Sequence, residues 1–165
     1  DPSYTTLAEL PDIYLEAVVA VEDHRFQQHC GIDIIAIARA TWNNIKSWSL
    51  REGGSTITQQ LAKNLWFTPE RSILRKLKEA IMTWRLELAL DKERILELYL
   101  NVAEWGNGVY GAEAAARHYF GKSAASLSRG EAARLAVMLP SPLRRTPSSA
   151  IVKRLSSRLL KRMPR

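Results

Sequence analysis

The sequence predicts a mostly α-helical fold, and three observations support that prediction. Apolar residues recur at helical spacing through most of the chain. Residues that cap helix N-termini, such as Asp33 and Ser128, stand immediately before several of these apolar stretches. A β-hairpin signature occurs at one place, the pair Asn107 and Gly108. We therefore expect helices throughout and at most one short pair of strands.

Length and composition favour a single domain over residues 1–165. Of these 165 residues, 46% are hydrophobic and 25% are charged, an ordinary globular composition for a chain that can bury a sizeable core. The sequence has no internal repeat and no low-complexity tract. One cysteine, Cys30, excludes an internal disulfide framework.

Four helices are predicted in the first part of the chain. Asp33 is the cap expected for the second helix, and Ser55 or Thr56 is the cap expected for the third. Pro69 is a favoured first residue and predicts the start of the fourth helix. The expected ranges are 11–23, 34–47, 55–66 and 69–90.

Four more helices are predicted in the second part. Asp91 caps the first of them, and a turn-rich loop follows it. Ser128 and Glu131 have the spacing of a capping box. The expected ranges are 92–105, 111–120, 129–139 and a basic C-terminal helix within 148–165.

Two acidic residues, Glu22 and Asp23, stand where the first helix should end. The carbonyl end of a helix carries partial negative charge and disfavours carboxylates. Apolar neighbours would raise the pKa of a carboxyl group there, as a proton-transferring acid or base requires. The alternative is a solvated acid pair in a loop.

The segment GGSTITQQLAKN, residues 53–64, has the physical features of a phosphate-binding loop without a Walker motif. Two glycines let the backbone approach a ligand, and a helix N-terminus offers N–H groups to an anion. Four side chains project along the following turns: Ser55, Gln59, Gln60 and Lys63. The alternative is an ordinary loop followed by a capped helix.

The next helix adds cations and a second candidate acid. Arg71, Arg75 and Glu79 are spaced four residues apart, and Lys78 precedes Glu79. Several positive groups suit a diphosphate, which Lys63 would also contact. Glu22 and Glu79 together match the pair of carboxylates used in sugar chemistry. The alternative for the charged residues of this helix is a solvated face of salt bridges.

Most of the positive charge lies at the C-terminus. The formal net charge is +7, and eight of the 24 basic residues follow position 140, where there are no acids. Residues 1–140 therefore hold 16 basic and 17 acidic residues. Ile151, Leu155, Leu159 and Met163 fall at helical spacing, so this tail either packs on the domain as its last helix or lies on a membrane.

Metal-binding and membrane-spanning patterns are absent from the sequence. The histidines lack the spacing of a zinc site, and we predict no protein-bound metal. No run approaches the roughly 20 apolar residues of a transmembrane helix. Because the chain starts at Asp1, we expect that an anchor or leader is missing from it.

Five motifs occur in one order and resemble the peptidoglycan glycosyltransferase domain. They are EDHRFQQHCG, GGSTITQQLAKN, RSILRKLKEA, RILELYLNVAEWGNGVYG and AAARHYFGK…LSRGEAARLAVMLPSP. The resemblance covers about residues 17–147. This domain occurs alone in monofunctional transglycosylases and at the N-terminal side of bifunctional penicillin-binding proteins. The chain has no transpeptidase segment, so it is more similar to the monofunctional type.

The resemblance implies a lysozyme-like fold with a large globular lobe and a small, mobile, membrane-facing lobe, to which residues 41–54 would belong. It implies polymerisation of lipid II into glycan strands. In that reaction the acceptor 4-hydroxyl attacks C1 of the donor with inversion, and undecaprenyl pyrophosphate leaves.

The resemblance also implies residue roles. Glu22 takes the place of the general base, Asp23 helps to organise the site, and Glu79 lies near the donor pyrophosphate. The positions that hold the donor sugar or pyrophosphate are Ser55, Gln59, Gln60, Lys63, Arg71 and Lys78. No cofactor is obligatory, although a divalent cation, Mg²⁺ or Mn²⁺, stimulates some members by bridging the leaving diphosphate.

The implied partners are lipid II, the growing glycan strand, the membrane surface and other proteins of cell-wall synthesis, without nucleic acid. The implied location is the periplasmic, outer face of a bacterial cytoplasmic membrane. Trp42 and Trp48, with Lys46, suit a membrane interface.

Two alternatives belong to other classes of protein. A lysozyme-like hydrolase would use a carboxylate but would not need Lys63, Arg71 and Lys78, because its leaving group is a sugar. A basic nucleic-acid-binding protein would explain the tail, and a steep salt dependence of DNA affinity would identify it. It would leave the acid pair and the Gly-Gly-Ser loop unexplained.

Overall fold

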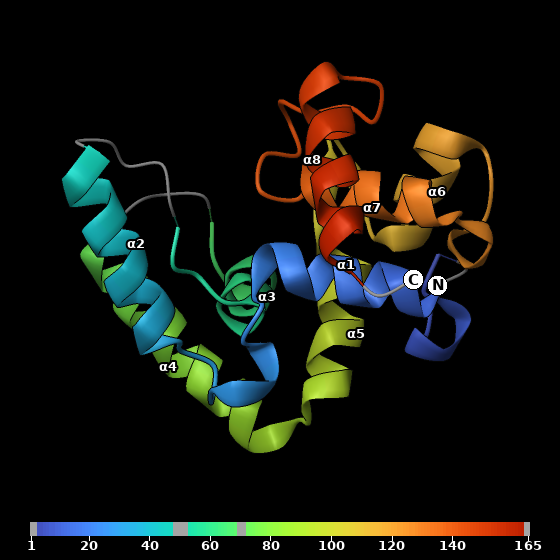
Figure 1. Cartoon of the computed structure of the whole chain (residues 1–165). Coiled ribbons are helices and arrows are strands. Elements are labelled where there is room, and N and C mark those ends of the chain that lie inside the picture. The colour runs from blue at the N-terminus through green and yellow to red at the C-terminus, as the bar shows by residue number, and fades with distance from the viewer. Residues whose placement is uncertain (1–2, 48–52, 69–71, 164–165) are drawn as a thin grey trace. The chain divides into compact units, whose positions relative to one another are not determined.

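The protein is mostly α-helical. A computed structural model describes residues 3–47, 53–68 and 72–163, and in these ranges it contains eight α-helices, three short 3-10 turns and one two-stranded hairpin (Figure 1). The fold divides into two compact units. Unit 1 comprises residues 1–24 and 97–165, and unit 2 comprises residues 25–96.

Unit 1 holds both ends of the chain. Its elements are the turn η1 (Leu7–Glu9), α1 (Asp12–Glu22), the second half of α5 (Lys92–Val102), β1 (Glu104–Gly106), β2 (Val109–Tyr110), α6 (Ala112–Phe120), the turn η3 (Ala124–Ser126), α7 (Arg129–Met138) and α8 (Ala150–Arg162). The two strands are antiparallel and confirm the predicted hairpin. Because residues 104–106 pair in this hairpin, α5 ends at Val102 and not at position 105 as the sequence predicted.

The core of unit 1 is built on α7, which packs against both α1 and α8. Its buried alanines, among them Ala132 and Ala136, leave room for close helix packing. Trp105 is fully buried and donates from its indole N–H to the carbonyl oxygen of Leu135 at 3.1 Å. The ring of Tyr14 lies 6.5 Å from that of Trp105, centroid to centroid, so α1 and the hairpin share one aromatic core.

Unit 2 consists of the turn η2 (Phe26–Gln28), α2 (Ile34–Ser47), α3 (Ile57–Trp66), α4 (Ile73–Ala89) and the first half of α5. Helix α3 packs against α4. Asp33 caps α2 as predicted, with its Oδ1 accepting from the Ala36 N–H at 3.0 Å. Thr56 caps α3 through a capping box with Gln59.

The start of α4 differs from the prediction. The helix begins at Ile73, where Ser72 supplies the N-cap, and Pro69, the predicted first residue, lies outside the described residues. The Ser72 hydroxyl accepts a hydrogen bond from the Arg75 N–H at 3.0 Å, which satisfies one of the first-turn donors.

Large apolar side chains are exposed on the helices of unit 2. On α4 they include Ile73, which is 91% exposed, and Leu77, Trp84 and Leu88. On α2, Ile34 and Trp42 are exposed. No described helix is both long and apolar enough to cross a membrane.

Candidate active site

The first candidate acid, Glu22, is the last residue of α1, and Asp23 is the C-cap. The Asp23 N–H donates to the carbonyl oxygen of Val19 at 2.9 Å, and Asp23 is only 7% exposed. Glu22 is half-buried, and its Oε1 atom is inaccessible to solvent. The two acids are therefore not a solvated pair in a loop, and Glu22 lies at the negative end of its helix.

Tyr99, on the part of α5 in unit 1, is a neighbour of Glu22 that the sequence analysis did not single out. The Tyr99 side chain is fully buried, and burial raises the pKa of its phenol well above the usual value. Electrostatic interaction with Glu22 and with the buried Tyr14 raises that pKa further. The Glu22 side chain and two buried tyrosines thus interact inside unit 1. The only sequence signal was a tyrosine on an otherwise apolar helix face.

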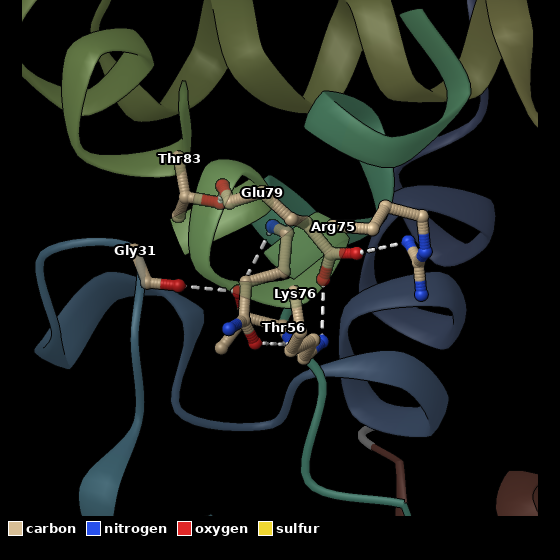
Figure 2. A network of polar contacts seen from close by, with 7 residues as sticks. Gly31, Thr56, Arg75, Lys76, Glu79 and Thr83 are labelled. Atoms are coloured by element: carbon tan, nitrogen blue, oxygen red, sulfur yellow. Dashed lines mark hydrogen bonds and ion pairs between the residues drawn. The ribbon is translucent and has the colours of Figure 1, made fainter. Parts of the chain in front are cut away.

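The second candidate acid, Glu79, is buried in unit 2 among cations (Figure 2). It lies on α4 and is 2% exposed. Arg75 Nη1 donates to Glu79 Oε2 at 2.7 Å, and Lys76 Nζ contacts Oε1. The alternative of a solvated face of salt bridges is therefore wrong for Glu79, because its carboxylate is buried.

The cations around Glu79 differ in part from those expected. Lys76 was missed, although its i,i+3 spacing indicates a contact. Lys78, the residue next to Glu79, is exposed, because neighbouring positions on a helix do not share a face. Lys63 is exposed on α3, and neither Lys63 nor Lys78 forms an ion pair with a described residue. Arg71 lies outside the described residues.

The N-terminus of α3 carries the other predicted substrate contacts. Ser55 is exposed and Gln60 is half-buried. Gln59 is 4% exposed, and its Oε1 accepts from the Thr56 N–H at 3.0 Å. In return, the Thr56 hydroxyl accepts from the Gln59 N–H at 3.1 Å. One of the N–H groups expected to face an anion is therefore already occupied by the cap.

Two glycines bring loops of unit 2 close to its helices. Gly31 has φ +85°, and a Cβ added there would lie 2.7 Å from the Thr83 methyl group on α4. Its carbonyl oxygen accepts a hydrogen bond from the Thr56 hydroxyl (Figure 2). A Cβ on Gly54 would lie 3.0 Å from the Ile37 Cα, so this glycine serves packing against α2. A Cβ added to Gly53 would meet no atom within 4 Å.

An ion pair fixes the loop between α1 and α2 within unit 2. Arg25 Nε lies 3.0 Å from Asp33 Oδ2, and Asp33 is 2% exposed. Burial alone would raise the pKa of Asp33, but the Ala36 N–H and the charges of Arg25 and His29 outweigh it, and the pKa is lowered. The first motif is thus joined to the N-terminus of α2.

The Glu79 carboxylate is not arranged to bind a divalent cation. Both of its oxygens already accept from protein cations, and further positive charge beside Arg75 and Lys76 would be repelled. Glu79 is therefore a poor ligand for a divalent cation. Stimulation by Mg²⁺ or Mn²⁺ at the diphosphate stays a prediction.

Comparison with known proteins adds an independent line of evidence. A family model described as Transglycosylase matches residues 1–164. The biosynthetic peptidoglycan transglycosylase of Thiobacillus denitrificans is 59% identical over 126 residues, which are 76% of this chain and 54% of that protein. The protein of the same name from Dechloromonas aromatica is 51% identical over 150 residues, which are 90% of this chain and 65% of that protein.

These relatives are longer than the chain, which spans between about half and two thirds of their length. The family match nevertheless runs through both units and through the segments that carry Glu22 and Glu79. By that match, the chain belongs to the transglycosylase family.

Proposed function

We propose that this chain is the catalytic domain of a peptidoglycan glycosyltransferase that polymerises lipid II into glycan strands. The match of the family model over residues 1–164 carries this proposal. The similarity to two biosynthetic peptidoglycan transglycosylases supports it. The reaction is an inverting displacement at C1 of the donor sugar.

In the proposed reaction, Glu22 is the general base. It accepts the proton of the acceptor 4-hydroxyl while that oxygen forms a bond to C1 of the donor. The bond from C1 to the phosphate oxygen breaks, and undecaprenyl pyrophosphate leaves with the electron pair. The position of Glu22 at the C-terminal end of α1 and the burial of its Oε1 atom support this assignment.

Cations of unit 2 receive the leaving pyrophosphate in this proposal. Lys63 and Lys78 are exposed and form no ion pair with a described residue, which leaves their charges available to an anionic substrate. Arg71 joins them by family resemblance. Glu79 orients Arg75 and Lys76, the two cations that contact it.

The remaining donor contacts come from three polar residues. We assign the donor sugar and pyrophosphate oxygens to Ser55, Gln59 and Gln60, and an organising role at the base to Asp23. The exposure of Ser55 at the N-terminus of α3 supports its assignment. Since the Gln59 oxygen is used in the cap, its NH₂ group is the part available to substrate.

The enzyme would work at the outer face of the cytoplasmic membrane, because its donor is held there by a lipid chain. The exposed apolar residues of α2 and α4 support this location, since surfaces of this kind on a water-facing domain mark sites of interaction. Trp42 is 68% exposed and Trp84 is 61% exposed, and tryptophan favours the membrane interface. Trp48 lies outside the described residues.

Incubation of the chain with fluorescent lipid II in a neutral detergent tests the proposed function. We expect a ladder of glycan polymer that lysozyme digests, and no polymer in a reaction without protein. Release of soluble muropeptides from purified sacculi, without polymer from lipid II, would instead assign a hydrolase.

A further inference from the structure

The C-terminal helix α8 has one packed face and one free face. Helix α8 packs on α7 (Figure 1), and Val152 and Ser156 are its buried residues. The packed face is thus centred on these two positions and not on Ile151, which is 42% exposed although the sequence placed it on the apolar face. The helix is therefore anchored in the core of unit 1.

The opposite face carries a row of cations that we call the basic stripe: Arg154, Arg158, Lys161 and Arg162. At 100° per residue these four positions, with Ile151, fall within an arc of about 100°. All four side chains are exposed, and none forms an ion pair with a described residue. The sequence from Ser141 onward contains no acid that could neutralise them.

The stability of α8 does not account for this stripe. Arg154, Arg158 and Arg162 are spaced i,i+4, and like charges at that spacing destabilise a helix. Lys161 and Arg162 lie in the last turn, where the helix dipole favours cations. Arg154 lies nearer the N-terminus and gains nothing from the dipole. A partner that supplies negative charge would offset the repulsion.

Apolar side chains accompany the stripe. Ile151 shares its face, and Leu143, 65% exposed, lies with the exposed Arg144 in the preceding loop. Cations mixed with aliphatic groups match a bilayer surface, where phosphates border hydrocarbon. Ile151–Arg162 also lacks the aromatic side chains on which single-stranded nucleic acids stack.

We propose that the basic stripe of α8 binds the anionic phospholipid headgroups of a bilayer. This contact lies in unit 1 and involves none of the residues assigned to substrate. It would attach the domain to anionic membranes in a manner that depends on salt.

Co-sedimentation with phospholipid vesicles tests this proposal. The variant R154Q/R158Q/R162Q removes three charges, and R154K/R158K/R162K keeps them at the same positions. On vesicles that contain phosphatidylglycerol we expect the Gln variant to lose at least about tenfold in partition coefficient, and the Lys variant to bind like the wild type. Salt at about 0.5 M should weaken wild-type binding to these vesicles.

Two controls separate this result from other effects. Polymerisation of lipid II in neutral detergent should be equal in all three proteins. This assay tests the proposed function separately from vesicle binding by the basic stripe. Equal partition of wild type and Gln variant on the anionic vesicles would overturn the proposal. A loss of the same size on phosphatidylcholine vesicles would also overturn it, as would tight binding to a DNA duplex with none to vesicles.

Discussion

Gly31 and Glu79 show how single residues fix the interior of unit 2. Gly31 takes a positive φ and lies against Thr83, while Glu79 holds two cations of its own helix. The sequence predicted the spacing of Arg75 and Glu79 but not the burial of Glu79, because burial depends on the loops that cover α4. It did not predict Tyr99 beside Glu22, since that contact joins residues far apart in the chain.

Replacing Gly31 by alanine should destabilise the protein by about 1–3 kcal/mol, because the new Cβ would meet Thr83 in a backbone conformation that alanine disfavours. Urea unfolding measures the change. Gly53→Ala is the matched control, since its Cβ meets nothing, and it should change stability by less than about 0.5 kcal/mol. Equal unfolding midpoints for the two variants would disprove the packing role of Gly31.

Lys76 and Lys78 are close in sequence but should have different roles. Lys76→Met removes a contact to buried Glu79 and should cost about 1 kcal/mol, a value reduced because Lys76 is half-exposed. Lys78→Met should leave the unfolding midpoint unchanged and raise the KM for lipid II. Steady-state kinetics and urea unfolding on both variants check this, and the reverse pattern would refute the assignment.

Helices were predictable as elements, whereas their ends and faces were less so. Periodicity and caps gave α1, α2 and α3 almost to the residue, since Asp33 and Thr56 act as local caps. The predicted start of α4 did not take account of Ser72, whose side chain caps the helix at Ile73. On α8, Ile151 is exposed, whereas Leu155, Leu159 and Met163 of the predicted apolar face are half-buried.

The cap of α4 can be tested directly. Ser72→Ala removes the acceptor of the Arg75 N–H and should cost about 1 kcal/mol in urea unfolding. Thr68→Ala, at the start that the sequence favoured, should have little effect because α4 begins at Ile73. A larger loss for the Thr68 variant would place the helix start where the sequence put it.

At the scale of the whole molecule, the family match spans both units, and the two units hold different candidate functional groups. Unit 1 holds the proposed base with its buried phenols, and unit 2 holds the cations and the capped helix. Motif order was enough to predict the family and a mostly helical fold. The resemblance implied two lobes but not the place of this boundary near residue 97, which falls inside one continuous helix, α5.

Alkaline solution should destabilise the protein through its buried phenols. Burial raises the pKa of Tyr14 and Tyr99 well above the usual value of about 10. Above about pH 10 the unfolded chain therefore loses phenolic protons that the folded chain keeps, and stability falls by up to about 1.4 kcal/mol per pH unit for each group.

Urea unfolding at about pH 9 and about pH 11 measures this loss. Tyr99→Phe should reduce the difference between the two pH values, while Tyr110→Phe, at an exposed position, should leave it unchanged. An identical pH dependence in the Tyr99 variant and the wild type would show that this phenol ionises alike in both states.

The polymerisation rate of Glu22→Gln tests the central claim most directly. Loss of a general base should lower lipid II polymerisation by about 10²–10⁴-fold. The variant should remain folded, which a cooperative urea unfolding transition would show. Glu16→Gln, an exposed change on the same helix, should keep full activity. Polymerisation at the wild-type rate by the Glu22 variant would contradict the account.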